Sequence, residues 1–339
     1  MDFIRVAVDA MGGDNAPVEI VKGAVKAVQD NNKIKVILVG KEEEINKELS
    51  KYKYDKERVD IVNASEVIIN DESPTLAIRR KKDSSMVVAF NLVKNKEADA
   101  FVSAGSTGAV LTGGLFIVGR IKGIERAPLA PLIPTLNGHS LLVDCGANVD
   151  ATPSQLVQFA RIGSIYMEEV VGIKNPKVAI VNIGTEEEKG NALVKETYPL
   201  LKECKDINFI GSIESRNIPY GEADVIVCEA FVGNVILKLY EGVALALMDV
   251  LKKAFVSNTK SKIGALLAKD AIKDSLKLLT SDDYGGAPLL GLNGLVVKTH
   301  GNSTHKDIRN AIIQCVTFTQ QNINEKIKEK ISESVKDNT

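Results

Sequence analysis

Five short stretches carry most of the residues whose types and spacing could do chemistry. Each is rich in Gly, Asn, Asp, Ser or Thr: Asp9–Pro17, Ser103–Ala109, Asp144–Asp150, Asn182–Asn191 and Cys228–Asn234. Glycine lets backbone N–H groups approach an anion closely. Any one stretch is as readily a turn or a helix cap, because the same residues dominate turns. Taken together, the five predict a polar anion-binding site.

Lys189 is the cation that stands out in these stretches. It lies between the acidic run Glu186–Glu188 and Gly190, and a lysine in such a loop can meet a phosphate as a point charge. A solvated surface lysine is the alternative, since the chain has 43 lysines and arginines.

Other kinds of chemistry have less support. There is no G-x-S-x-G or G-x-x-x-x-G-K-[ST] motif, and no G-x-G-x-x-G follows the first predicted strand. Cys145 could be a thiol nucleophile, but a small buried residue is the commoner role. His300 and His305 have no carboxylate or cysteine cluster beside them, which favours a loop or helix cap over a metal site.

The elements that must position these residues alternate along the chain. Apolar, β-branched runs predict nine strands: Ile4–Val8, Ile34–Val39, Val59–Val62, Ala100–Val102, Leu141–Val143, Val178–Val181, Asn208–Ile210, Val225–Val227 and Leu295–Val297. Helical segments between them indicate βαβ units and an α/β fold with a mostly parallel sheet. Because ligands bind at the carboxyl ends of such strands, we expect the five stretches to converge on one rim.

The segment 241–279 has no strand signal. It predicts two helices, Glu241–Val256 and Lys262–Leu279, which would form a helical hairpin projecting from a single domain over residues 1–339. Apolar and basic residues recur at helical spacing in 262–279. They fit core packing or a dimer contact first, and a membrane-surface helix second.

Composition bounds the partners and the compartment. The formal net charge is −1 and Trp is absent, which argues against nucleic acid as a partner. The four cysteines form no C-x-x-C pair, so the cytoplasm is expected. The amino-terminus does not look like a signal peptide. No uninterrupted apolar run approaches about 18–20 residues, so we expect no bilayer-spanning segment.

Nine motifs, in order, carry a resemblance to a known family. They are D-A-M-G-G-D-N-A-P, R-R-K-K-D-S-S-M, S-A-G-S-T-G-A, G-R-I-K-G, D-C-G-A-N-V-D, N-I-G-T-E-E-E-K-G-N, F-V-G-N-V-I-L-K-L-Y-E-G, Y-G-G-A-P-L-L-G and H-G-N-S. From about Val6 to Gln320 the chain resembles the phosphate acyltransferase (PlsX) family. The resemblance implies a three-layer Rossmann-like fold similar to phosphotransacetylases and isopropylmalate-type dehydrogenases, a homodimer, and neither an organic cofactor nor a required metal.

The resemblance also implies site residues. Lys189 and Asn234 match a phosphate-holding and catalytic pair. The implied pocket residues are Asp9, Gly12, Gly13, Asp14, Asn15, Ser106, Thr107, Gly108, Asp144, Asn148, Thr185, His300 and Ser303. Where the family often has C/T-D-G-F, this chain has Cys228–Phe231, with Glu229 one methylene longer than Asp.

The implied reaction moves a fatty acyl group from acyl carrier protein to inorganic phosphate, giving acyl phosphate for phospholipid synthesis. A glycerol-3-phosphate acyltransferase would act downstream. The basic run Arg79–Lys82 could steer the acidic carrier, or be a solvated helix end. Rival interpretations are a phosphotransacetylase that uses acyl-CoA, a β-decarboxylating dehydrogenase, and a membrane-associated scaffold without activity.

Overall fold

The computed structural model describes residues 3–272 and 285–336. The chain divides into two compact units. Unit 1 consists of Met1–Pro131, Arg161–Lys174 and Asp282–Thr339, and unit 2 of Leu132–Ala160 and Asn175–Ser281. All nine predicted strands are present, and the mostly parallel α/β class is confirmed.

Unit 1 is built on a six-stranded sheet with the order β10-β11-β4-β1-β2-β3. Its strands are β1 (Ile4–Asp9), β2 (Ile34–Gly40), β3 (Val59–Asn63), β4 (Ala100–Ser103), β10 (Ala287–Pro288) and β11 (Leu295–Lys298). All neighbouring pairs are parallel except β10 with β11. The central strand β1 reads I-R-V-A-V-D, and its Val6, Ala7 and Val8 are fully buried. A strand buried on both faces needs such an almost continuous apolar run.

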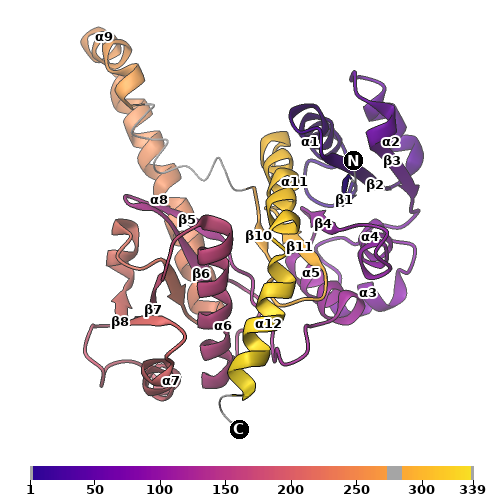
Figure 1. The fold of residues 1–339 in the computed structure, drawn as a ribbon. Helices are drawn as coiled ribbons and strands as arrows, with labels where there is room; N and C mark the ends of the chain where they lie inside the picture. Colours follow the sequence, from indigo (N-terminus) through magenta and orange to yellow (C-terminus); the bar gives the residue numbers. More distant parts are fainter. Residues whose placement is uncertain (1–2, 273–284, 337–339) are drawn as a thin grey trace. The chain divides into compact units, whose positions relative to one another are not determined.

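Unit 1 also contains helices, several of which pack against this sheet. They are α1 (Val18–Asp30), α2 (Glu42–Leu49), α3 (Pro74–Arg80), α4 (Ser85–Lys94), α5 (Thr107–Gly113), α11 (His305–Gln320) and α12 (Ile323–Lys336). Shorter turns are η1 (Lys56–Arg58), η2 (Gly114–Val118) and η3 (Met167–Val171). Figure 1 shows α1 and α11 side by side. The Phe90 and Phe101 rings, 4.2 Å apart, join α4 to β4 in the core.

Unit 2 is built on a five-stranded sheet with the order β5-β6-β9-β7-β8. Its strands are β5 (Leu132–Thr135), β6 (Gly138–Val143), β7 (Lys177–Asn182), β8 (Asn208–Glu214) and β9 (Val225–Val227). Only the edge pair β5 and β6 is antiparallel. The helices are α7 (Ala192–Glu203), η4 (Ser215–Tyr220), α8 (Ala230–Val256) and α9 (Thr259–Leu267), and α6 (Pro153–Tyr166) is divided between the units.

The predicted hairpin is α8 and α9, which Figure 1 shows running away from the sheet of unit 2. The second predicted helix, Lys262–Leu279, differs from the structure: α9 ends at Leu267, and 273–279 lie outside the described residues. α9 has no buried residue, and Leu266 and Leu267 are 72% and 83% exposed. Core packing is therefore wrong for α9, whereas the dimer contact, ranked equally with it, stays a prediction.

α8 is long and apolar enough to cross a bilayer by length and composition, although the sequence predicts no bilayer-spanning segment. An 18-residue window within it has a mean hydropathy of 1.5 and is 6% buried. Charged residues such as Lys238 and Glu241 interrupt the apolar residues, so no continuous run is visible in the sequence. Length and composition alone do not place this helix in a membrane.

Candidate active site

The five polar stretches end strands of two different sheets, two stretches in unit 1 and three in unit 2. In unit 1, the unit 1 loop cluster consists of Asp9–Asn15 after β1, Ser103–Gly108 after β4 and Lys298–Ser303 after β11. In unit 2, the unit 2 loop cluster consists of Asp144–Asn148 after β6, Asn182–Asn191 after β7 and Cys228–Asn234 after β9. Within each sheet the three strands concerned are neighbours.

Asp9 lies beneath the unit 1 loop cluster and is 1% exposed. Its carboxylate accepts hydrogen bonds from Ser103 Oγ at 2.7 Å and from Met11 N at 3.3 Å. Ser103 Oγ in turn accepts from Gly105 N at 2.9 Å. Burial raises the pKa of Asp9, against the opposing effect of these hydrogen bonds and one from Ser85. Asp9 therefore ties two loops together from below.

Close approach explains the glycines after β1. A Cβ on Gly12 would lie 2.4 Å from Asp9 Oδ2 and 2.8 Å from Gly105 N, so a larger residue would separate the two loops. Asp14 N donates to Gly301 O at 2.7 Å. The first and third segments of the cluster are thus also joined by a backbone hydrogen bond.

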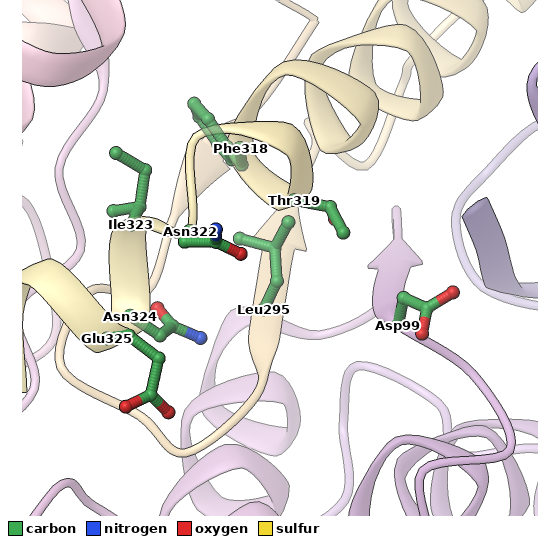
Figure 2. Close-up of a pocket in the computed structure, with 8 residues that line it drawn as sticks. All are labelled: Asp99, Leu295, Phe318, Thr319, Asn322, Ile323, Asn324 and Glu325. Atoms are coloured by element: carbon green, nitrogen blue, oxygen red, sulfur yellow. The ribbon is translucent and has the colours of Figure 1, made fainter. Parts of the chain in front are cut away.

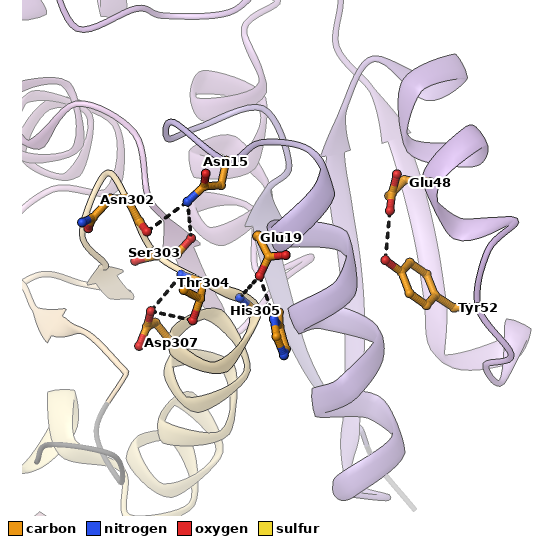
Figure 3. A network of polar contacts seen from close by, with 9 residues as sticks. All are labelled: Asn15, Glu19, Glu48, Tyr52, Asn302, Ser303, Thr304, His305 and Asp307. Atoms are coloured by element: carbon orange, nitrogen blue, oxygen red, sulfur yellow. Dashed lines mark hydrogen bonds and ion pairs between the residues drawn. The ribbon is translucent and has the colours of Figure 1, made fainter. Parts of the chain in front are cut away.

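Figure 3 shows the polar contacts between α1 and the start of α11. The Asn15 side-chain amide donates to Asn302 O at 3.0 Å and to Ser303 O at 3.2 Å. Glu19 accepts from His305 N at 2.6 Å and lies 2.7 Å from His305 Nδ1. His305 thus lies at a helix start, as the non-metal interpretation expects.

The remaining predicted residues of unit 1 differ in exposure. Ser106 is half-buried, Thr107 is exposed, and Gly108 packs against Pro74 of α3. His300 is exposed, whereas Ser303 is 3% exposed and its Oγ has no hydrogen-bond partner among the described residues.

Asp144 organises the first loop of the unit 2 loop cluster. It is fully buried and accepts from Asn148 N at 2.8 Å, Asn148 Nδ2 at 2.7 Å and Ala147 N at 3.2 Å. The predicted residues Asp144 and Asn148 are therefore bonded to each other. Both carboxylate oxygens of Asp144 thus accept hydrogen bonds from the loop that follows it and fix the conformation of that loop.

Asn234 is brought beside this loop by the residue before it. Gly233 packs so tightly that a Cβ there would lie 1.9 Å from Asp144 O. The Asn234 Oδ1 atom lies 4.0 Å from the position of a Cβ on Gly146. Within the described part of the chain, the Asn234 amide makes no hydrogen bond, so its donors are free for a ligand.

Lys189 lies in the loop after β7, with its side chain 45% exposed. Its Nζ donates to Glu186 Oε1 at 2.8 Å, and this hydrogen bond raises the Lys189 pKa. The ammonium is therefore kept at neutral pH. Its backbone is held by Asn182, whose Nδ2 donates to Lys189 O at 3.1 Å. Thr185, also predicted, is exposed in the same loop.

The cysteines of the unit 2 loop cluster are poor nucleophiles. Cys145 and Cys228 are 3% and 4% exposed, and burial raises the pKa of both thiols well above the usual value. A thiol nucleophile must ionise to react. Glu229, the departure from the family pattern, caps α8 by accepting from Phe231 N at 2.6 Å and Val232 N at 2.9 Å.

A separate pocket of about 140 Å³ in unit 1 contains none of the predicted site residues. Figure 2 shows its lining by Phe318, Ile323 and Leu295 with Asp99 and polar residues around Asn322. Asp99 precedes β4 and Leu295 begins β11, so the pocket lies at the opposite strand ends from the unit 1 loop cluster.

Lys298 of the unit 1 loop cluster is not among the residues predicted from the sequence, and Ser103 is predicted only as part of the stretch Ser103–Ala109. Lys298 is a lysine only 8% exposed, at the end of the apolar strand L-V-V-K. A lone charge that closes a buried strand was the available signal, because lysine is seldom buried without partners. Among the described residues, no group of three His, Cys, Asp or Glu side chains could hold a metal ion.

Comparisons with known proteins indicate the same family as the motifs. The family model described as "Fatty acid synthesis protein" matches residues 4–326. A phosphate acyltransferase of Alkaliphilus oremlandii is 53% identical over 329 residues, covering 97% of this chain and 98% of the relative. One of Clostridium novyi is 48% identical over 332 residues, covering 98% and 100%.

The fold is similar to that of a solved phosphotransacetylase from Streptococcus pyogenes. The TM-score is 0.61 at 20% identity, covering 94% of each chain. The predicted resemblance to the phosphotransacetylase fold is confirmed. From the family match and the identity of near full-length relatives, the chain belongs to the fatty acid synthesis protein family, among the phosphate acyltransferases.

Proposed function

We propose that this chain transfers a long-chain fatty acyl group from the thiol of acyl carrier protein to inorganic phosphate. The product, acyl phosphate, would serve phospholipid synthesis through a glycerol-3-phosphate acyltransferase. The observation that carries the proposal is the unit 2 loop cluster, which presents an exposed cation, Lys189, and an unpartnered amide, Asn234. The names of the near full-length relatives agree with it.

The proposed reaction is direct attack by a phosphate oxygen on the thioester carbonyl carbon. The new C–O bond forms, the carbonyl becomes an oxyanion, and the C–S bond then breaks. The carrier leaves as a thiolate and takes a proton from water. Phosphate is already an anion near neutral pH, so no protein nucleophile is required, which is consistent with the buried thiols of Cys145 and Cys228.

Each cluster has a role in this proposal. In unit 2, Lys189 offers a positive charge to an anionic reactant, and Asn234 donates to the oxyanion. The unit 1 loop cluster binds the substrate phosphate through backbone N–H groups and small polar side chains. Orientation of the two reactants can lower the activation barrier by up to about 7–11 kcal/mol. We therefore propose that residues 1–339 act as a single acyltransferase without a cofactor.

The test is phosphate-dependent release of free thiol from palmitoyl-acyl carrier protein. Lys189→Ala should lower the rate about 10²–10³-fold or more, since it removes the positive charge that holds the anionic reactant. The matched control is Lys195→Ala, an exposed lysine on α7 of the same unit, which should retain wild-type activity. A Lys189→Ala enzyme with a near wild-type rate would contradict the assignment.

Comparing donors at equal concentration separates the rival enzyme. Release from palmitoyl-CoA but not from the carrier protein would indicate a phosphotransacetylase-like enzyme. If a folded protein releases no thiol from either donor, the result would favour the scaffold interpretation. Hydroxylamine-sensitive acyl phosphate must accumulate if the proposal is right.

We also propose that α8 and α9 form a homodimer contact, with peripheral attachment to the cytoplasmic face of a membrane as the second role of 262–279. Leu239, Val243, Leu247 and Val250 on α8 are each more than half exposed in the single chain, and an apolar surface of this extent marks an interaction site. Leu247→Glu should give monomers in sedimentation, whereas Leu266→Glu should lower flotation with anionic vesicles. Unchanged mass and flotation would contradict both roles.

A further inference from the structure

Lys298 occupies an unusual position for a lysine. It is the last residue of β11, which pairs in parallel with β4, and its register partner is Ser103. The residue is 8% exposed. Lysine is almost never buried to this degree unless its ammonium is paired. A partner must therefore justify its burial.

The partners are backbone carbonyl oxygens of two segments. The Lys298 Nζ donates to Ala104 O at 3.4 Å and to Thr299 O. Ala104 belongs to Ser103–Gly108 and Thr299 to Lys298–Ser303, the second and third segments of the unit 1 loop cluster. Thr299 N donates to Ser103 O at 2.9 Å, so the ammonium reinforces a junction that the backbone also makes.

Two carboxylates balance the charge. Asp9, from the end of β1, and Asp14, from the loop after it, both favour the protonated ammonium electrostatically. β4 contributes Ser103 and the apolar residues before it, none of which titrates near neutral pH. The desolvation that accompanies burial outweighs the carboxylates and lowers the pKa of Lys298 to about 8.

We propose that Lys298 is a positioning residue of the acyl transfer, which holds the Ser103–Gly108 and Thr299–Ser303 segments in the arrangement that binds the substrate phosphate. This inference rests on the proposed function. The protonated ammonium has three donors, and two of them fix carbonyl groups whose segments meet at the cluster. An uncharged side chain of the same length keeps the packing and releases both carbonyl groups.

The first experiment measures the KM for phosphate and kcat in thiol release from palmitoyl-acyl carrier protein. Lys298→Met, which keeps the length without the charge, should raise the phosphate KM at least ten-fold, with a smaller change in kcat. The matched control is Lys326→Met in the same unit. Lys326 pairs with Glu169 between α12 and η3, and its loss should leave the phosphate KM within two-fold of wild type.

A Lys298→Met enzyme with a phosphate KM within two-fold of wild type would overturn the inference, whatever its kcat. That outcome leaves the proposed function intact, because the wild-type enzyme still releases thiol. Absence of phosphate-dependent release from the wild type would instead reject the proposed function. The two failures are therefore distinguishable.

The second measurement needs no variant that might lose its fold. Between pH 7 and 9.5 the wild-type phosphate KM should rise as the Lys298 ammonium loses its proton. Lys298→Arg, which stays charged throughout this range, should show a flatter profile. A wild-type phosphate KM that does not change between pH 7 and 9.5 would overturn the inference even if no Lys298 variant folds.

Thermal unfolding adds a readout of opposite sign. The folded pKa of Lys298 is depressed, so above about pH 8 the unfolded chain binds more protons than the folded one, and stability relative to Lys298→Met should rise with pH. Activity and relative stability should therefore move in opposite directions as pH rises. Parallel movement of the two would contradict a role for the protonated ammonium.

Discussion

The loop clusters of unit 1 and unit 2 contain the same kinds of residue but use them differently. In the unit 1 loop cluster two charged groups are buried, although Asp14 is exposed: Asp9 is 1% and Lys298 8% exposed, and both are bonded within the cluster. In the unit 2 loop cluster only Asp144 is buried in this way, while Lys189 is 45% exposed and the Asn234 amide has no partner in the described chain.

This difference separates two tasks. Buried, fully bonded polar groups fix the shape of a loop, because leaving any of them unpaired is expensive. Exposed or unpartnered groups add little to the fold and remain available to a substrate. Mutations in the two clusters should therefore divide between those that lower stability and those that lower catalytic activity.

Asn234→Ala should lower catalytic turnover strongly without lowering stability. Loss of one oxyanion donor lowers turnover about 10²–10³-fold, equivalent to about 2.7–4 kcal/mol of transition-state stabilisation. The free energy of unfolding should not change, because the amide has no partner to lose. Thiol-release kinetics and urea unfolding of the same preparation check both halves. A destabilised Asn234→Ala protein would show that the unit 2 loop cluster is also structural.

Gly233→Ala should combine the two effects. The new Cβ would lie 1.9 Å from Asp144 O, a backbone atom that cannot rotate away, and overpacking of this kind costs about 1–3 kcal/mol. Activity should fall as well, since Asn234 follows directly. Urea unfolding and thiol release measure the pair of effects.

Gly242→Ala is the matched control for this change. It lies in the same helix, α8, with nothing within 4 Å of its added Cβ. Alanine is favoured over glycine within a helix by about 0.5–1 kcal/mol, so stability should rise slightly. Equal destabilisation by both changes would mean that the contact with Asp144 does not decide the effect.

Ser103→Ala should mainly lower the free energy of unfolding. It removes the hydroxyl that donates to Asp9 and accepts from Gly105 N. Leaving buried groups without a partner costs about 1–3 kcal/mol, which urea unfolding can measure. Ser106→Ala, at a half-buried residue three positions along, should change stability by much less. Equal unfolding free energies for the two variants would contradict the structural role assigned to Ser103.

The sequence predicts more of the fold than of the site. Strands such as Ile34–Val39 are visible because a strand buried on both faces must be almost wholly apolar. The short antiparallel strands β5 and β10 were not predicted, because Ala287–Pro288 and Leu132–Thr135 contain proline and are too short for a periodic signal.

The site is harder because the same residue type serves opposite tasks. Asp9 and Asp144 resemble ligand residues in the sequence, yet both are buried beneath their loops. Lys298 resembles a surface lysine and is buried. Exposure depends on contacts between strands distant in sequence, such as β11 with β4, and no local pattern records them. Division of the strands between two sheets is hidden for the same reason.

The smallest expected effect concerns Arg79 and Arg80, which are exposed on α3, whereas the neighbouring Lys81 is paired with Glu72. If they steer an acidic carrier, Arg79→Ala/Arg80→Ala should lower kcat/KM for palmitoyl-acyl carrier protein about three- to ten-fold at low salt, mainly through slower association. Neither the phosphate KM nor the unfolding free energy should change.

Salt provides the discriminating measurement for this prediction. The Debye length, the distance over which exposed charges interact, shortens to about 3 Å at 1 M ionic strength. The loss of kcat/KM in Arg79→Ala/Arg80→Ala should therefore become smaller as salt is added. Lys26→Ala/Lys33→Ala removes the same charge from exposed positions on and just after α1 and should have no such effect. If both double variants lose the same activity, net charge rather than the α3 surface attracts the carrier. A defect that persists at high salt would instead place the two arginines with the structural residues of the unit 1 loop cluster.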